Sequence, residues 1–520
     1  MKPYLFQHLF DQTVEKYSKK EFIKQKDNSF SYNKIRAHSL ALAKALRELK
    51  INLGDRVGIW LDKSPEQVIS LLGTLYADGI FVIISPVLHH DQTMHILKDC
   101  NVKFLITDVK KFNILSTDLE NTEVAQIILV DESLDNTISM QELLETYSGY
   151  QVESVAKNSD TSNIIYTSGS TGKPKGIVLS HQNLIEGAEI VSEYLNITDQ
   201  ERIAGVLPFN FDYGLNQLTT SILKGASLVL HNFFLPNDLL NLLEKEEITG
   251  LAGIPPIWTA IFNTKLTAKK KCNFSKLRYL TNSGGKVPVP IVKNMRDFFP
   301  NTDIYLMYGL TEAFRSTYLP PSEIDKRPNS IGKAIPRTEM FIINNQGKEC
   351  APHEKGELIH KGACITKGYW NDPEKTNQIF RPDPLAKPGE KAQTVVYSGD
   401  LIYKDEEGFL YFVSRKDEMI KVQGYRVSPT EVEEILLKHE SIQDAVVFGI
   451  EARDGEKKIL ALITTNQDIN STNIIEHCKK EAPSYMVPHE IIFYKSFPKT
   501  ASGKIDRAIL KRECLVHKEG

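Results

Sequence analysis

The chain has 520 residues, more than one hydrophobic core normally accommodates, so at least two domains are expected. Its 41% hydrophobic content, 25% charged content and net charge of −3 are ordinary for a globular protein and argue against a nucleic-acid partner bound through its phosphates. The six cysteines are scattered without a C-x-x-C pair, which fits a reducing compartment rather than a zinc site or disulfide framework. With charges early in the N-terminus and no apolar run of membrane-spanning length, we expect a cytoplasmic protein.

The first part of the chain alternates between helical and strand patterns. Residues 32–50 and 65–76 place apolar side chains at helical spacing, and the strand patterns lie at 54–60, 81–84, 104–108 and 126–131. This alternation predicts a parallel sheet with helices packed on it. The His89-His90 pair lacks a third ligand at a suitable spacing and is expected to be a surface feature.

The segment Tyr166–Gly176, YTSGSTGKPKG, has the composition of a phosphate-binding loop. Its glycines let successive backbone N–H groups point at an anion, while hydroxyls and lysines add donors and positive charge. Apolar residues on both sides predict two strands, so the loop is expected at a hairpin tip. Pro174 stands where a Walker loop needs a hydroxyl, so this is a different motif, and a surface turn rich in glycine and serine is the simpler alternative.

Residues 207–218, LPFNFDYGLNQL, contain one carboxylate among aromatic and aliphatic residues. Phe211 and Tyr213 are unremarkable as core residues. Asp212 is costly to bury without a partner, so either this segment is exposed or a positive group meets the carboxylate.

Two later segments carry further candidates for a nucleotide site. Gly284-Gly285 would let the backbone pass close to a flat ligand such as adenine. The turn after 303–308 bears Tyr308, Thr311 and Glu312, which could serve base stacking, phosphate and magnesium in that order. By itself, the YGLTE segment indicates a nucleotide site only weakly. It becomes informative because it follows the glycine-rich loop in the chain.

Beyond residue 340, short strands and turns predict a smaller β-rich unit. Asp400, at a tight turn, is suited to accept two hydrogen bonds from a ribose diol. The charged run 415–418 marks a probable boundary, and it is followed by a predicted helix at 429–438, strands at 445–450 and 459–464, and a polar loop at 498–507.

These five blocks, in this order, resemble the AMP-forming adenylating enzymes (acyl-CoA synthetases, peptide-synthetase adenylation domains and luciferases) from about Phe30 to Arg507. The resemblance implies an α/β fold with a large N-terminal domain of mixed sheets and packed helices at 1–414, including a β subdomain at about 335–414. It further implies a hinge at 415–418 and a small mobile α+β domain at 419–520.

Carried over by position, the resemblance implies a role for each matching residue. The catalytic residues would be Lys504, Lys175, Thr311 and Glu312, with Glu312 also binding magnesium. The ATP contacts would come from Thr167, Ser168, Gly169, Ser170, Thr171, Gly172, Lys173, Gly284, Gly285, Tyr308, Asp400 and Arg415. The acid would meet Phe211, Asp212, Tyr213 and Met307, Asp417 would be the hinge, and Gly424 would line the pantetheine tunnel.

The resemblance therefore implies a ligase that uses ATP and magnesium to make an acyl-adenylate from a small carboxylic acid and passes it to a phosphopantetheine thiol. An amino acid is favoured, because Asp212 aligns with the aspartate that faces the α-amino group in amino-acid adenylation domains. Only thirteen residues follow Arg507, so a separate carrier protein is the expected acceptor. The alternatives are an acyl-CoA synthetase for an ordinary acid, a non-catalytic nucleotide-binding protein and a luciferase-like oxygenase. Ser414 and Lys286 depart from the residues usual in the family.

Overall fold

The computed structural model describes residues 5–167, 174–262, 273–387, 389, 391–416, 418–422, 425–451, 457–467 and 469–516. Ser168, Gly169, Ser170, Thr171, Gly172, Lys173, Asp417 and Gly424, to which the sequence assigns roles, lie outside these ranges. Within them, no helix is both long enough and apolar enough to cross a bilayer.

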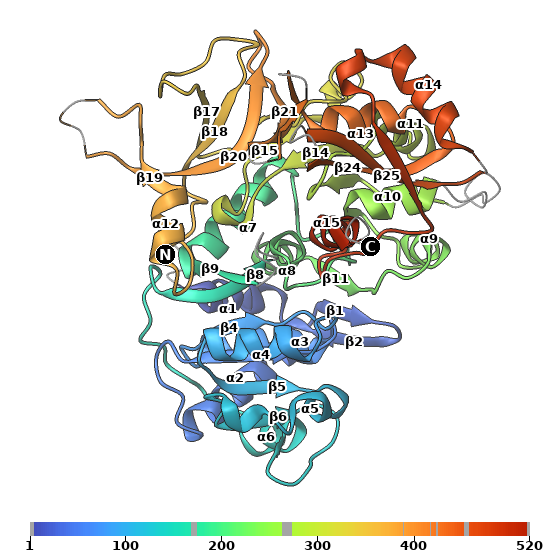
Figure 1. Ribbon diagram of the computed structural model, residues 1–520. Coiled ribbons are helices and arrows are strands. Elements are labelled where there is room, and N and C mark those ends of the chain that lie inside the picture. Colours follow the sequence, from blue (N-terminus) through green and yellow to red (C-terminus); the bar gives the residue numbers. More distant parts are fainter. Residues whose placement is uncertain are drawn as a thin grey trace.

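A seven-stranded sheet in the order β7-β6-β5-β3-β4-β8-β9 occupies the blue and cyan part of the chain (Figure 1). Its described strands are β3 (Arg56–Trp60), β4 (Ile80–Ile83), β5 (Val102–Thr107), β6 (Gln126–Leu129), β7 (Ile138–Ser139), β8 (Thr161–Thr167) and β9 (Lys175–Ser180). β3 pairs in parallel with β4 and β5, and β5 with β6, which confirms the predicted parallel sheet. β8 and β9 pair antiparallel, so the hairpin predicted around the glycine-rich loop is also confirmed.

A nine-stranded sheet in the order β16-β15-β14-β13-β12-β10-β11-β1-β2 lies beside the first. Its described strands are β1 (Glu21–Gln25), β2 (Asn28–Ser31), β10 (Arg202–Gly205), β11 (Ser227–Leu230), β12 (Gly250–Gly253), β13 (Tyr279–Asn282), β14 (Asp303–Tyr308), β15 (Thr317–Leu319) and β16 (Lys333–Ala334). β12, β13 and β14 are parallel, so their carboxyl ends meet at one edge. This edge is where open α/β sheets bind ligands.

Helices pack on both sheets, most of them within one large hydrophobic core and two of them, at 90–99 and 109–115, in a separate cluster. They are α1 (Phe6–Tyr17), α2 (Tyr32–Glu48), α3 (Pro65–Tyr76), α4 (His90–Asp99), α5 (Val109–Leu115), α6 (Met140–Thr146), α7 (His181–Tyr194), α8 (Asp212–Lys224), α9 (Pro236–Lys245), α10 (Pro255–Phe262) and α11 (Val289–Phe298). α3 begins where Ser64 caps the backbone N–H of Gln67 and Pro65 takes the first helical position. α8 ends at Gly225, whose φ of +74° suits glycine.

The predicted β-rich region after residue 340 is confirmed as a five-stranded sheet. Its described strands are β17 (Thr338–Ile343), β18 (Gly356–Gly362), β19 (Phe380–Pro382), β20 (Thr394–Lys404) and β21 (Leu410–Arg415), and α12 (Pro373–Ile379) leads into β19. β20 pairs antiparallel with β21, which places Asp400 opposite Arg415.

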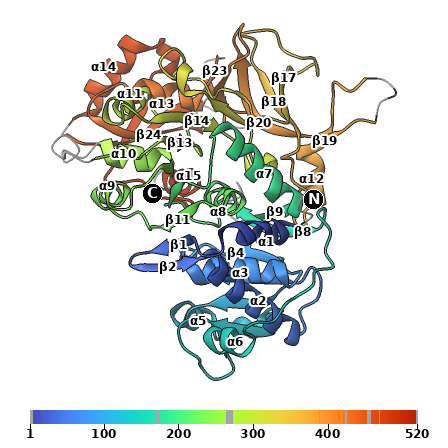
Figure 2. The ribbon, with the colours of Figure 1, turned by 180° about the vertical axis from the view of Figure 1, so that it is seen from behind.

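The last hundred residues contain a hydrophobic core of their own, distinct from the large one. Their elements are β22 (Ile420–Val422), β23 (Tyr425–Val427), α13 (Pro429–Leu437), β24 (Ile442–Glu451), β25 (Lys457–Thr465), α14 (Ser471–Glu481), β26 (Glu490–Tyr494) and α15 (Arg507–Val516). In both views α13 lies beside α11, so this region faces the carboxyl edge of the nine-stranded sheet (Figures 1 and 2).

The packing of α7 against the segment after β14 generates a first prediction. A Cβ added at Gly187 would lie 2.2 Å from the Cε1 atom of Phe314, which is fully buried. We expect Gly187→Ala to lower the free energy of unfolding by about 1–3 kcal/mol through overpacking, measured by chemical denaturation. Glu193→Ala, on the same helix and exposed, should change it by less than about 0.5 kcal/mol. Equal stability of the two variants would contradict this role of Gly187.

Candidate active site

A cavity of about 450 Å³ lies between the carboxyl ends of β13 and β14 and the helix α13. Five of the residues predicted from the sequence line it together: Gly284, Gly285, Met307, Tyr308 and Lys504. The strand ends provide the glycines, methionine and tyrosine, whereas the lysine enters from the C-terminal region. Residues separated by about 200 positions in the chain therefore form one site.

Lys504 enters this cavity from a tightly held loop. Thr500 donates its backbone N–H to the carbonyl of Lys504 at 2.7 Å, and its hydroxyl accepts the backbone N–H of Lys504 at 3.2 Å. The Nζ atom lies 4.8 Å from the centre of the Phe211 ring. Burial lowers the pKa of Lys504, and the nearby Asp212 carboxylate partly opposes this shift.

Gly284 makes room for the Lys504 side chain. Its φ is +77°, and a Cβ there would approach the Cε atom of Lys504 to 2.8 Å. The Gly284-Gly285 pair was expected to allow close approach of a flat ligand. In this arrangement the close neighbour of Gly284 is the lysine chain, and any substitution at Gly284 would both strain the backbone and displace Lys504.

The predicted adenosine contacts Tyr308, Asp400 and Arg415 are brought together. The Tyr308 hydroxyl donates to Asp400 Oδ2 at 2.5 Å, and Arg415 Nε lies 3.2 Å from Asp400 Oδ1. Burial raises the pKa of Asp400 to about 6, although Arg415 and the Tyr308 hydroxyl oppose the shift. This carboxylate is therefore close to its titration point near neutral pH and is fixed by two partners.

The other predicted catalytic residues lie around the ends of the glycine-rich hairpin. Lys175 Nζ is 3.3 Å from Asp372 Oδ2, and the Tyr369 hydroxyl donates a hydrogen bond to Glu312 Oε1. Thr311 and Glu312 share a short 3-10 turn. Tyr369 and Asp372 were not predicted from the sequence. The only sequence feature that could have indicated them is their position within a turn-rich segment.

The carboxylate of Asp212 has a positive partner within the protein. Asp212 begins α8 and is buried. Arg315 Nη1 lies 3.1 Å from Asp212 Oδ2, and Arg315 Nη2 donates to the Asp212 backbone carbonyl at 3.2 Å. The second of the two alternatives predicted from the sequence, that a positive group meets this carboxylate, is therefore confirmed, and the group is Arg315. Arg315 is 103 positions away from Asp212 in the chain, and no local sequence pattern indicates that the two side chains meet.

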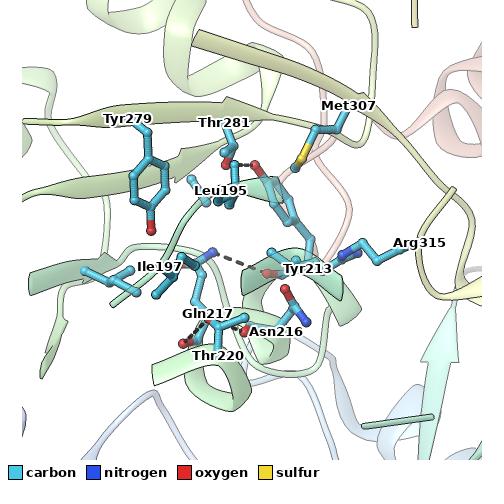
Figure 3. Close-up of a pocket in the computed structure, with 13 residues that line it drawn as sticks. Leu195, Ile197, Tyr213, Asn216, Gln217, Thr220, Tyr279, Thr281, Met307 and Arg315 are labelled. Atoms are coloured by element: carbon cyan, nitrogen blue, oxygen red, sulfur yellow. Dashed lines mark hydrogen bonds between the residues drawn. The ribbon is translucent and has the colours of Figure 1, made fainter. Parts of the chain in front are cut away.

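Behind this ion pair lies a small closed cavity of about 20 Å³ (Figure 3). It is lined by the α8 residues Tyr213, Asn216, Gln217 and Thr220 and by Val191, Leu195, Ile197, Ile203, Ala252, Tyr279, Thr281, Met307 and Arg315. Tyr213 and Thr281 share a hydrogen bond of 2.5 Å between their hydroxyls. Met307 lines both this cavity and the large one, so the two cavities adjoin at its side chain.

One ion pair joins the C-terminal region to the rim of the large cavity. Lys286 Nζ lies 2.5 Å from Glu434 Oε1 on α13, and both residues line the cavity. Lys286 is one of the residues that depart from the family pattern. Its contact with α13 links that departure to the orientation in which Lys504 enters the site.

Comparisons with known proteins agree with this architecture. The family model of the AMP-binding enzyme matches residues 10–370, and the model of the AMP-binding enzyme C-terminal domain matches residues 431–504. The chain is 30% identical, over 97% of its length, to gramicidin S synthase 2 of Aneurinibacillus migulanus, but it spans only 11% of that relative. It is 28% identical over 98% of its length to a long-chain-fatty-acid–CoA ligase of Bacillus subtilis and spans 94% of that relative.

Among solved structures, an anthranilate CoA ligase in complex with anthranoyl-AMP superposes with a TM-score of 0.89. It is 23% identical to this chain, and the match covers 99% of this chain and 98% of that one. This similarity shows that the two proteins share a fold.

The raised pKa of Asp400 generates a prediction about pH. Below about pH 6 the carboxyl becomes protonated and loses acceptor capacity for two ribose hydroxyls, so kcat/KM for ATP should fall about tenfold per pH unit. In Asp400→Asn this acidic limb should disappear, with a lower kcat/KM throughout. Steady-state kinetics between pH 5 and 8 measure both, and an unchanged limb in the variant would assign the titration to another group.

Proposed function

Because the chain belongs to the AMP-binding enzyme family and is an AMP-forming acid–thiol ligase, we propose that it activates a small amino or imino acid as an acyl-adenylate and transfers the acyl group to the phosphopantetheine thiol of a separate carrier protein. The observation that carries the proposal is the position of Lys504. Its ammonium lies between the predicted nucleotide contacts and the segment bearing Phe211 and Asp212.

The first half-reaction brings two anions together, since a carboxylate attacks the α-phosphoryl group of ATP and pyrophosphate leaves. A buried cation directed at both groups lowers the barrier by neutralising charge that develops during the attack. Lys504 has the burial and the reach for this role. Tyr308, Asp400 and Arg415 would hold the adenosine, and Lys175 and the loop at 168–173 would hold the phosphates.

Glu312 fits the role of magnesium ligand. Mg²⁺ bound with ATP usually takes one or two carboxylates, with phosphate oxygens and water completing its shell. Glu312 supplies one such carboxylate, oriented by the Tyr369 hydroxyl. When bound, the ion would neutralise phosphate charge.

The second half-reaction needs the site to open, because Lys504 occupies the space beside Gly284. A thiol can then attack the acyl-adenylate and release AMP. We propose that the C-terminal region moves about Asp417 and that Gly424 then lines the path of the pantetheine arm.

The role of Lys504 predicts different effects on the two half-reactions. Lys504→Ala should lower adenylate formation by about 10²–10³-fold, the usual loss for one preorganised electrostatic group, measured as exchange of labelled pyrophosphate into ATP. Thioester formation from supplied acyl-AMP should change less than about threefold. Lys499→Ala, at the start of the same loop, is the matched control. Equal loss of both half-reactions would rule out a role confined to adenylation.

The preference for an amino acid rests on Asp212. Arg315 pairs with Oδ2, and no hydrogen bond to Oδ1 occurs within the described residues. The Asp212 carboxylate is close enough to Lys504 to oppose in part the lowering of the pKa of that lysine by burial. A substrate ammonium could share this carboxylate with Arg315.

The same ion pair favours a second candidate, an acyl-CoA synthetase for an acid without an amine. If Arg315 neutralises Asp212 completely, the site offers no net charge to an ammonium, and coenzyme A becomes the plausible acceptor. Thioester assays with coenzyme A and with a phosphopantetheinylated carrier protein distinguish the two acceptors.

Asp212→Asn separates the two candidate substrates. For an amino acid such as valine, kcat/KM in pyrophosphate exchange should fall by roughly 10²-fold, because a partner of a desolvated charge pair is lost. For isovalerate, which lacks only the amine, it should change less than about threefold. Similar losses for both acids, or activity of the wild type on isovalerate alone, would favour the acyl-CoA synthetase.

A further inference from the structure

Two residues that line the small cavity each have one buried polar side-chain atom without a partner among the described residues. Arg315 Nε, a donor, and Gln217 Oε1, an acceptor, are buried and make no hydrogen bond within the described residues. Both residues line the cavity of about 20 Å³. A buried donor and a buried acceptor without hydrogen-bond partners cost free energy. We therefore expect the cavity to bind a group that can form hydrogen bonds with both.

The two side chains cannot readily turn to find other partners. Arg315 is held through Nη1 and Nη2 by Asp212 and by the Phe314 carbonyl at 2.9 Å, and its guanidinium lies 5.3 Å from the centre of the Tyr213 ring. Gln217 donates its Nε2 hydrogen to the carbonyl of Tyr213 at 3.3 Å, an orientation drawn in Figure 3. These contacts hold both side chains in place at the cavity while Nε and Oε1 remain available for a hydrogen bond.

The cavity lies directly behind the reacting region. Phe211 contacts Lys504, Asp212 follows it, and Tyr213 and Gln217 on the next turns of α8 line the cavity. Met307 lines both this cavity and the large one that contains Lys504, so the two cavities adjoin at its side chain. An acid whose carboxylate meets Lys504 would therefore direct the far end of its acyl group toward Arg315 and Gln217.

Size and charge restrict what this far end can be. The cavity of about 20 Å³ is large enough for a group of the size of water or of a hydroxyl. A carboxylate could accept from Arg315 Nε but could not donate to Gln217 Oε1, and it would face the negative charge of Asp212. A hydroxyl group has one hydrogen to donate and an oxygen that accepts, so it can pair with both the donor Nε and the acceptor Oε1.

We propose that Arg315 and Gln217 select an acid that carries a neutral hydroxyl on a short acyl group, with Arg315 Nε donating to the hydroxyl oxygen and the hydroxyl donating to Gln217 Oε1. This inference rests on the proposed function, since it names the acid that the ligase activates. Arg315 and Gln217 are specificity-determining residues in this reaction, and a methyl in place of the hydroxyl leaves both polar atoms unpaired.

The test uses four acids that vary the amine and the hydroxyl independently: threonine, valine, 3-hydroxybutyrate and isovalerate. Threonine and valine differ by a hydroxyl in place of a methyl, and the other two are their counterparts without the amine. We expect kcat/KM in pyrophosphate exchange to be at least about tenfold higher for the hydroxyl member of each pair, because a site with buried polar groups rejects the analogue that cannot pair with them. Both enantiomers of 3-hydroxybutyrate are measured.

The outcomes separate this inference from the proposed substrate preference. Equal rates within both pairs would overturn the inference, since a water molecule would then satisfy the two atoms, and so would the absence of exchange with all four acids. A hydroxyl effect without an amine effect would overturn the preference for amino acids and leave the inference standing.

Gln217→Leu supplies an independent measurement. It should reduce the discrimination between hydroxyl and methyl acids to less than about twofold, mainly by lowering kcat/KM for the hydroxyl member. Gln67→Leu is the matched control: Gln67 is also buried with an unpartnered Oε1, but it lies on α3 outside the cavity, so discrimination should persist. Retained discrimination in Gln217→Leu would overturn the role of Gln217. If that variant does not fold, the wild-type comparison still decides the inference.

Discussion

The buried ion pair between Asp212 and Arg315 organises the acid side of this enzyme. It joins the first residue of α8 to the segment that follows β14, two parts of the chain that meet only in the folded protein. Breaking a buried pair leaves an uncompensated charge, which costs far more than an exposed pair contributes. The geometry of the pair therefore determines the position of the α8 N-terminus, the rings of Phe211 and Tyr213, and the cavity behind them.

Among the predicted nucleotide contacts, a second buried carboxylate also depends on its partners, but these are less buried. Asp400 is buried but is held by a tyrosine hydroxyl and an arginine that remains half exposed. Burial raises its pKa to about 6, whereas Asp212 has its partner within the protein interior. The two buried carboxylates thus differ because different neighbours compensate the loss of hydration of each one.

The C-terminal region completes the site from outside the main core. It has a hydrophobic core of its own, and it contributes Lys504 and residues of α13 to the large cavity, with the ion pair between Lys286 and Glu434 at the rim. An ion pair of this kind contributes little free energy, so it would oppose the proposed withdrawal of Lys504 only weakly. The burial of Lys504 is unfavourable to its charge, and the proposed withdrawal would relieve it.

Sequence patterns by themselves determined the family, the alternation of helices and strands around 32–131 and the pairing of strands on both sides of the glycine-rich loop, and they predicted the residues of a nucleotide site. These features depend on local periodicity and on motifs whose spacing is read along the chain. The tertiary structure alone decided the partner of Asp212, because Arg315 is about a hundred residues away and no local pattern reports which charges meet. The tertiary structure also determined the small cavity between α8 and β13. A cavity exists only where side chains from several elements leave space between them.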